Sequence, residues 1–404
     1  MDIRITALLI FAATYAVVAF GRLPWSRLDR TGAALLGASL MVASGALSLD
    51  DAYRAVDFNT ITLLLGMMII VATLRVSGFF GLAAAWVEGH ARRPLFLLGG
   101  IALVSALLSA FLVNDTICLM LTPLVAEMTL ATRRNAVPYL IAVAMASNIG
   151  SVATITGNPQ NIMIGSFSQI PYGHFVAALA PVAAMGVVVA LVFIVALHRR
   201  EFLEGGSLRH HAVAVEWDGW LLAKSLFVFG ALIAAFFWGV TPAKAAIVAG
   251  ALLLLTRRVP TERILREIDW PLLLLFAGLF IVTSGGEKAL LTPELQRAVG
   301  ALDLGKPLNL AIIAAALSNL VSNVPAVLVL KPFIAGLGDP DRAWLTLAMG
   351  ATLAGNFTIL GSIANLIVVQ RAKRHGIVID FWDHFRIGAP VTIVTIALGV
   401  WWLS

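Results

Sequence analysis

The chain has 404 residues, of which 60% are hydrophobic and only 12% are charged. A soluble domain of this length carries roughly 25% charged residues, so this chain cannot cover a water-exposed surface and is predicted to be a membrane protein. Its net charge of +6 is explained by Lys and Arg retained in cytoplasmic loops of a membrane protein. The charge therefore does not indicate a nucleic-acid partner, and none is expected. The single cysteine, Cys118, excludes an intrachain disulfide and a cysteine-rich metal site. No glycine-rich phosphate loop with a lysine is present, so the chain does not encode ATP-driven transport.

Apolar segments follow one another along the whole chain. Measured against a span of about 20 residues, the candidate spans are 5–20, 31–49, 58–74, 174–197, 219–239, 242–256, 270–284 and 388–403. The first segment lacks a small-residue cleavage site followed by a soluble region, so we expect it to be retained. Segments 79–91 and 287–303 are amphipathic and are predicted to lie in the membrane interface. The sequence therefore predicts an all-α polytopic membrane protein.

Basic residues predict the orientation. Lys and Arg favour the cytoplasmic side of a bacterial inner membrane, and most of the 28 basic residues, Arg30 among them, fall in loops that can share that side. This assignment places both termini in the periplasm. The pairs Arg92-Arg93 and Arg133-Arg134 flank one long apolar stretch, and both pairs favour the cytoplasm. A stretch that enters and leaves on the same side is a re-entrant hairpin, with its tip at Asn114-Asp115, where irregular backbone is tolerated only inside protein or beside water.

Four long apolar stretches are interrupted by polar residues, and they form two matching pairs. Hairpin 94–132 and broken helix 137–167 correspond to hairpin 306–338 and broken helix 343–370. The matched residues, first half before second, are Asp57 and Asp269, Ser109 and Ser318, Asn114 and Asn323, Pro123 and Pro332, Asn148 and Asn356, Gly157 and Gly361, and Asn161 and Asn365.

The repeat divides the chain into three parts. They are an N-terminal repeat at 1–200, a cytoplasmic linker at 201–218 and a C-terminal repeat at 219–404. The charge pattern gives the two halves opposite orientations. Inverted repeats with discontinuous helices indicate a secondary transporter whose site lies near the bilayer midplane.

Broken helices provide the chemistry expected at that site. Their new N-terminal ends favour anions and oxygen acceptors, and their carbonyl ends coordinate cations. The residues expected to contact the substrate or ion are Asn114, Asp115, Thr116, Asn148, Thr154, Thr156, Gly157, Asn158, Asn161, Ser322, Asn323, Asn356, Thr358, Gly361 and Asn365. This set suits a small polyhydroxy or oxyanion solute. It offers no transition-metal site, no cofactor site is evident, and no nucleophile indicates an enzyme.

Asp115 is the candidate for proton coupling. A carboxylate at the bilayer centre costs about 2.5–3.5 kcal/mol on insertion scales, so its presence is a functional hypothesis by default. The alternative is a structural cap on the second arm of the hairpin, and both roles are compatible. The second half has Val324 at the matching position, so the charge is asymmetric.

The motifs at the breaks resemble the ion transporter superfamily. They are Ala146–Ser151, Gly157–Asn161, Val321–Pro325 and Ala354–Asn365. The superfamily includes citrate-transporter-like permeases, arsenite efflux permeases, divalent-anion/sodium symporters and certain sodium/proton antiporters. The form Gly-Asn-Pro-Gln-Asn is most similar to plant silicon and arsenite efflux transporters and their bacterial relatives. The resemblance implies a scaffold domain, a transport domain that moves as an elevator, and a homodimer.

Three functions follow as expectations. The leading one is proton-coupled export of a small inorganic oxyacid, such as silicic acid or arsenite, and a neutral acid agrees with the lack of an arginine beside the breaks. The first alternative is a sodium-coupled anion or carboxylate symporter, with sodium at Asn114, Asn148, Asn323 and Asn356. However, the similar dicarboxylate symporters carry Ser-Asn-Thr at both hairpin tips, which this chain does not. The second alternative is a sodium/proton antiporter.

Overall fold

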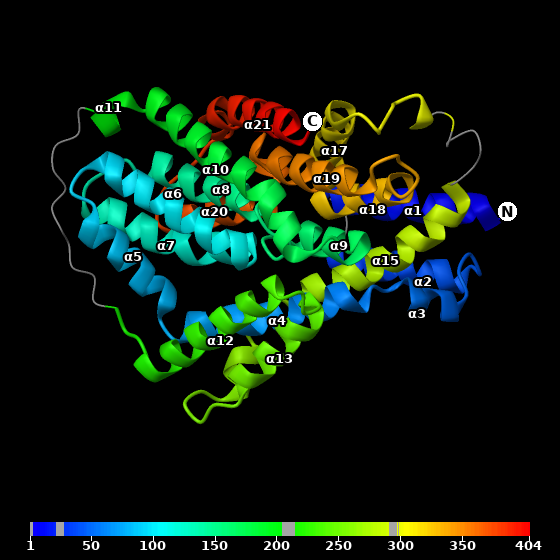
Figure 1. Cartoon of the computed structure of the whole chain (residues 1–404), viewed down its shortest axis with the longest axis horizontal. Helices are drawn as coiled ribbons and strands as arrows, with labels where there is room; N and C mark the ends of the chain where they lie inside the picture. Colours follow the sequence, from blue (N-terminus) through cyan, green and yellow to red (C-terminus); the bar gives the residue numbers. More distant parts are fainter. Residues whose placement is uncertain (1–2, 22–27, 204–214, 291–296, 298) are drawn as a thin grey trace.

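The computed structural model describes residues 3–21, 28–203, 215–290, 297 and 299–404. Every regular element within these residues is a helix (Figure 1), which confirms the predicted all-α class. Seven of the described helices are long and apolar enough to cross a membrane, and shorter apolar helices accompany them. The fold is therefore that of a polytopic membrane protein.

The helices follow the interrupted pattern of the sequence. The first half contains α1 (Ile3–Phe20), α2 (Arg30–Ala43), α3 (Leu49–Ala55), α4 (Phe58–Val76), α5 (Phe79–His90), α6 (Pro94–Phe111), α7 (Asn114–Ala131), α8 (Ala136–Ser151), α9 (Pro159–Ser168), α10 (Tyr172–Leu197) and α11 (Arg199–Leu203). The second half contains α12 (Gly219–Phe237), α13 (Pro242–Leu254), α14 (Thr261–Leu265), α15 (Trp270–Leu290), α17 (Pro307–Val321), α18 (Asn323–Ile334), α19 (Pro340–Leu353), η1 (Ala354–Asn356), η2 (Ile359–Gly361), α20 (Ile363–Arg374) and α21 (Phe381–Leu403).

Three of the predicted span boundaries are wrong. The predicted span 270–284 is too short, because α15 continues to Leu290. The predicted span 31–49 ends early, because Gly45 adopts a left-handed conformation (φ 75°) just after α2 and stops it at Ala43. The predicted span 388–403 starts late, because Asp380 forms a capping box that begins α21 at Phe381. The predicted linker 201–218 lies largely outside the described residues. The predicted interfacial segment 287–303 is described in part, and its first residues belong to the end of α15.

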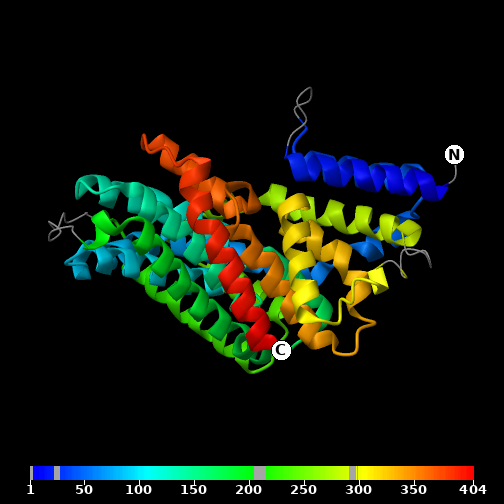
Figure 2. The same ribbon diagram turned by 90° about the horizontal axis from the view of Figure 1, so that it is seen from above.

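One body of the molecule consists of two tightly packed helix pairs, α4 with α13 and α2 with α15. In Figure 1, α4, α12, α13 and α15 follow its lower edge, and Figure 2 shows α1 lying beside α15. A Cβ atom on Gly66 of α4 would lie 2.5 Å from the Ala246 backbone of α13. A Cβ atom on Gly278 of α15 would lie 2.7 Å from the Ala34 backbone of α2. Gly66 and Gly278 are as far apart in the sequence as Ala34 and Ala246. The same close contact between a glycine and the backbone of a neighbouring helix therefore occurs twice.

The other body contains the hairpins and the broken helices. The α6–α7 hairpin packs on α8, and the α17–α18 hairpin packs on α19, while α10 and α21 lie against each other. The contacts are again reciprocal, because α9 packs on α19 and α20 packs on α8. This arrangement brings both breaks, α8–α9 and α19–α20, into the interior.

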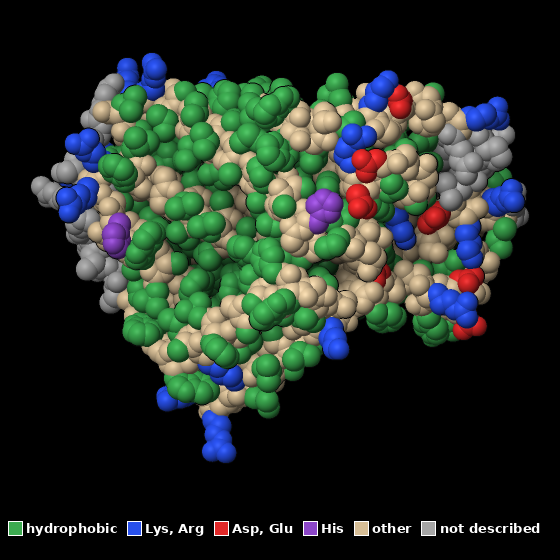
Figure 3. Space-filling model, in the orientation of Figure 1, with side chains coloured by type: hydrophobic (Ala, Val, Ile, Leu, Met, Phe, Trp, Pro, Cys, Tyr) green, Lys and Arg blue, Asp and Glu red, His purple; other side chains and the backbone are tan. Residues whose placement is uncertain are grey.

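The molecular surface fits a lipid environment. Figure 3 shows hydrophobic side chains over much of one face, with Lys and Arg mainly at its left and right ends and along its lower edge. Large side chains such as Phe227, Trp238 and Val192 are strongly exposed. Apolar surface on this scale is stable in a bilayer and unfavourable in water.

Candidate functional site

The tips of both hairpins and the starts of both second half-helices face one partly open cavity. Its polar lining consists of Arg30, Asn114, Asp115, Gln160, Ser322, Asn323 and Ser362. Leu272, Phe276 and Leu279 of α15 form part of an apolar wall. The space that can hold the centre of a water molecule is about 40 Å³, which admits a few waters or one small solute.

Four helix N-termini converge on this cavity. The first residues of α7, α9, α18 and α20 all line it: Asn114, Pro159, Asn323 and Ile363. The N-terminal end of a helix carries a partial positive charge and unpaired N–H groups. The convergence therefore favours ligands rich in oxygen acceptors.

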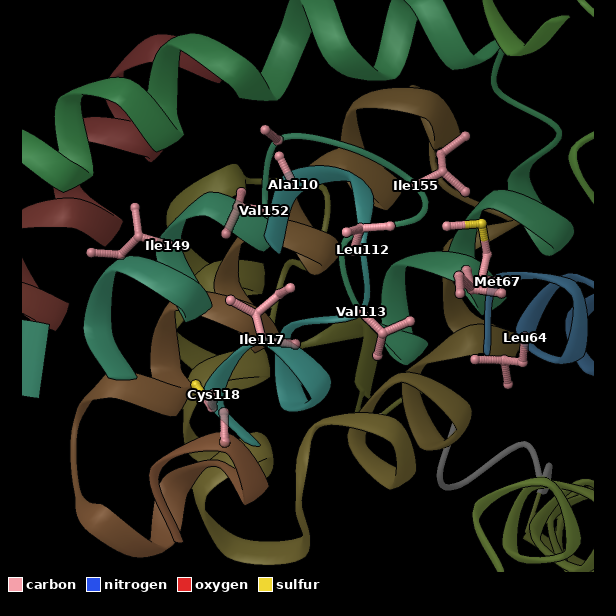
Figure 4. Close-up of a cluster of buried hydrophobic side chains, with 14 of the residues drawn as sticks. Leu64, Met67, Ala110, Leu112, Val113, Ile117, Cys118, Ile149, Val152 and Ile155 are labelled. Carbon is pink, nitrogen blue, oxygen red and sulfur yellow. The ribbon is translucent and has the colours of Figure 1, made fainter. Parts of the chain in front are cut away.

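The first hairpin tip is fixed by hydrogen bonds to the first break. The Asn114 N–H donates to the Gly157 carbonyl at 3.0 Å, and the Ser147 hydroxyl donates to the Asn114 carbonyl at 3.1 Å. Figure 4 shows Leu112 and Val113 at this tip among buried side chains that include Ile155 of the break and Met67 of α4. Asn114 and Asp115 are thus held by a rigid apolar surrounding.

A buried amide network joins the two repeats behind the cavity. The Asn114 amide donates to Asn148 Oδ1 at 2.9 Å. The Asn148 amide donates to Oδ1 of Asn356 and of Asn365, both at 3.0 Å. The Ser362 hydroxyl also donates to Asn148 Oδ1, at 3.1 Å. Asn148, Asn356 and Asn365 therefore contact one another rather than line the cavity.

The polar residues of the first break satisfy the local backbone. The Asn158 amide donates to Ser151 Oγ at 2.9 Å, and the Asn161 amide donates to the Thr154 carbonyl at 3.0 Å. The hydroxyls of Thr154 and Thr156 lie 3.2 Å apart. A Cβ atom on Gly157 would collide with the Ser151 carbonyl, which explains the glycine. These five predicted site residues support the break and do not line the cavity.

The second hairpin tip is strained. Ser322 has φ 80° and ψ 159°, a region that is essentially restricted to glycine. The Ser318 hydroxyl bridges this tip to the broken helix, donating to Asn323 Oδ1 and to the Ala351 carbonyl. Thr358 and Gly361 lie in the second break, where the Thr358 carbonyl accepts from Asn365 at 3.0 Å; neither lines the cavity.

Several buried polar atoms of the site have no hydrogen-bond partner among the described residues. They are Oδ1 of Asn114, Nδ2 of Asn356 and Oδ1 of Asn319. Asn114 is only 3% exposed and lines the cavity. An unpaired buried oxygen costs free energy unless a ligand or water completes it, which makes Asn114 a candidate ligand position.

Asp115 lies between two cavities. It lines the hairpin-tip cavity and also a second cavity, bordered by Thr116, Asp269 and Glu267. Arg75, at the end of α4, also borders the second cavity and forms an ion pair with Glu267. Asp115 is therefore the one charged residue that faces both spaces among the described residues.

Three polar residues of the cavity were not predicted from the sequence: Arg30, Gln160 and Ser362. Gln160 stands inside the Gly-Asn-Pro-Gln-Asn motif, and Ser362 is the cap of α20, so both lay within recognised segments. Arg30 was assigned to a cytoplasmic loop. The expectation that no arginine reaches the site is wrong, because the fold places the start of α2 beside the hairpin tips.

Within the described residues, no group of three or more His, Cys, Asp or Glu side chains could hold a metal ion. The polytopic helical fold with a buried polar cavity is that of a membrane transporter. The model of the citrate transporter family matches residues 15–349, and the chain belongs to that family.

Individual relatives agree with this assignment. An uncharacterised transporter of Mycobacterium tuberculosis is 32% identical over 431 residues, covering 99% of this chain and 97% of the relative. The silicon efflux transporter LSI3 of Oryza sativa subsp. japonica is 29% identical, covering 96% of this chain and 95% of the relative. The crystal structure of the YdaH transporter of Alcanivorax borkumensis matches with a TM-score of 0.61 at 14% identity, over 100% of this chain and 97% of that one.

Proposed function

We propose that this protein is a secondary active transporter that exports a small, uncharged inorganic oxyacid of the silicic or arsenous acid type in exchange for protons. The observation that carries the proposal is the convergence of four helix N-termini and one carboxylate on a small, partly open cavity. The N-termini can donate to the acid's oxygens, and an ionised Asp115 can accept from its hydroxyl groups. The similarity to the rice silicon efflux transporter supports the same class of substrate.

The size of the cavity favours a small solute. A space of about 40 Å³ for water-sized centres suits an acid with three or four hydroxyl groups around one central atom. A tricarboxylate such as citrate needs a larger space and more than one fixed positive charge. Arg30 and Asp115 give the cavity one charge of each sign, so its side chains match an uncharged solute.

Proton exchange follows from the position of Asp115. Its ionised form accepts hydrogen bonds from the acid with both oxygens, and its protonated form is a weaker acceptor, so proton binding and acid binding oppose each other. Competition of this kind makes the transporter an exchanger. The second cavity, which reaches Arg75 and Glu267, gives Asp115 a polar route toward the side that the basic residues predict to be cytoplasmic.

Alternating access is proposed to use an elevator motion. The α2–α15 and α4–α13 pairs would form the fixed scaffold, and the hairpins with the broken helices would form the moving part. The reciprocal contacts between the two halves support an internal repeat, and an inverted repeat provides two equivalent end states. We also propose a homodimer in the bacterial inner membrane, by resemblance to the superfamily.

The test is flux in proteoliposomes that contain the full chain. An imposed pH gradient should drive arsenous acid uphill in the wild type, and Asp115→Asn should abolish the gradient-driven part at equal reconstitution. Asp50→Asn, at an exposed position of α3, is the matched control and should transport normally. Undiminished gradient-driven flux in Asp115→Asn would contradict the proton role. Flux that requires sodium, measured with choline as the replacement, would instead support the symporter alternative.

A further inference from the structure

Arg30 occupies an unexpected place at the cavity. It is the first residue of α2, whose start is fixed by the Asp29 side chain accepting from the Gly32 N–H at 2.8 Å. The helix packs along α15, and α15 forms the apolar wall opposite the hairpin tips. Within the described part of the chain, no hydrogen bond or ion pair within 4 Å occupies the guanidinium group. Its N–H donors therefore have no partner among the described residues, and the side chain lines the cavity.

The charges around Arg30 form a balanced set. Arg30 and Asp115 line the same cavity, and their charges are close enough to interact. The other charged groups near Asp115 lie in the adjoining cavity, where Glu267 is paired with Arg75 and Asp269 faces Asp115 from the start of α15. Asp115 is thus the carboxylate that shares the enclosed space with Arg30, although the two do not form a close ion pair.

Arg30 and Asp115 line one cavity without an ion pair between them, so a ligand in that cavity can contact both. A guanidinium group donates to oxygen in a fixed fork, while an ionised carboxylate only accepts. A neutral polyhydroxy acid can accept from Arg30 and donate to Asp115 at the same time. The unpaired Oδ1 atom of Asn114 offers a second acceptor for the acid's hydroxyl groups.

We propose that Arg30 is a substrate-binding residue that sets the charge selectivity of the site. When Asp115 is ionised, its negative charge balances the positive charge of Arg30, and the cavity accepts a neutral oxyacid. When Asp115 is uncharged, the positive charge of Arg30 remains, and the cavity accepts a monovalent oxyanion. The inference rests on the proposed function only for the identity of the natural substrate. The effect of Arg30 and Asp115 on the charge of the bound ligand can be tested without that substrate.

The first experiment measures binding of arsenous acid to the purified full chain in lipid nanodiscs by titration calorimetry. Removal of a hydrogen bond to a charged group weakens binding by roughly 10- to 100-fold, and this loss is expected for Arg30→Gln. Arg30→Lys keeps the charge but not the fork, so a smaller loss is expected. Arg54→Gln, on the exposed surface of α3, is the matched control and should bind as the wild type does. An affinity of Arg30→Gln within twofold of the wild type would overturn the proposal.

The second experiment uses nitrate as a monovalent oxyanion. Asp115→Asn should gain nitrate binding that the wild type lacks, because an enclosed unbalanced charge favours an anion. The double variant Arg30→Gln with Asp115→Asn should lose that binding again, which a purely structural arginine would not predict. Nitrate binding that persists in the double variant, or never appears in Asp115→Asn, would overturn the charge role.

The two experiments separate this inference from the proposed function. If the wild type binds no oxyacid but Asp115→Asn gains Arg30-dependent nitrate binding, the proposed function fails and the role of Arg30 stands. If the wild type binds and transports the oxyacid but Arg30→Gln is unchanged in both assays, the role of Arg30 fails alone.

Discussion

Ser322 holds a backbone conformation that residues with a Cβ atom rarely adopt. Its φ of 80° and ψ of 159° place it at the turn between α17 and α18, where it lines the cavity. Conformations of this kind cost about 1–3 kcal/mol and persist only where the surroundings enforce them. The strain therefore fixes the second hairpin tip in one shape.

Ser322→Gly is expected to raise the thermal stability of the protein by roughly 1 kcal/mol, because relief of strain exceeds the added entropy of the unfolded chain. The same change should weaken oxyacid binding, since a glycine tip is less confined. Thermal unfolding and calorimetric titration measure the two effects. Ser322→Ala is the control, because it removes the hydroxyl and keeps the strain, so it should not stabilise. Equal stabilisation by Ala and Gly would refute the strain argument.

Some residues of the cavity could be predicted from the sequence, and Arg30 could not. Asn114, Asp115, Ser322 and Asn323 stand at apparent breaks in apolar runs, and the structure places all four on one cavity. Arg30 gave no such signal, because it follows a polar loop and resembles the other loop arginines. Its position depends on tertiary packing between α2 and α15, which no local pattern encodes.

At the scale of elements, close packing between helices rests on two matched glycines. Gly66 of α4 meets the Ala246 backbone, and Gly278 of α15 meets the Ala34 backbone. Small residues allow helices in membranes to approach closely and gain van der Waals contacts. The two contacts occur at equivalent places in the two halves, so both helix pairs depend on the same feature.

Gly66→Ala is expected to destabilise the protein by about 1–3 kcal/mol, because the added methyl group would lie 2.5 Å from backbone atoms of α13 that cannot move aside. Gly230→Ala in α12 is the matched control. No atom lies within 4 Å of a Cβ atom placed there, so alanine should be neutral or slightly stabilising. Midpoints of thermal unfolding in detergent decide the matter, and equal effects at both positions would contradict the packing argument.

Elements differ in how well the sequence predicts them. Apolar runs identify the helical class because a membrane requires long helices with satisfied backbones, and the structure confirms that class. The ends of helices depend on caps. Gly45 and the Asp380 box moved two predicted boundaries, since both signals are short and lie outside the apolar runs. The amide network of Asn148 was also unpredictable as a network, because its partners come from distant segments.

At the scale of the whole molecule, the two bodies meet along few contacts. One of them is the pair of rings of Phe167 in α9 and Phe280 in α15, whose centroids lie 6.3 Å apart. Within the first body, by contrast, the Tyr15 hydroxyl of α1 lies 2.8 Å from the Thr283 hydroxyl of α15. An elevator motion would separate the first pair and leave the second unchanged.

A cross-linking experiment tests this motion. In a Cys118→Ala background, the variant Phe167→Cys with Phe280→Cys should transport before treatment and lose transport after a short thiol cross-linker joins the two positions. Reduction of a cleavable linker should restore it. The matched pair Tyr15→Cys with Thr283→Cys should cross-link without losing transport, because both residues belong to the body that is proposed to stay fixed. If the cross-linked Phe167 and Phe280 positions left flux intact, α9 and α15 would not move apart, and access would have to alternate by motion of the hairpin tips alone.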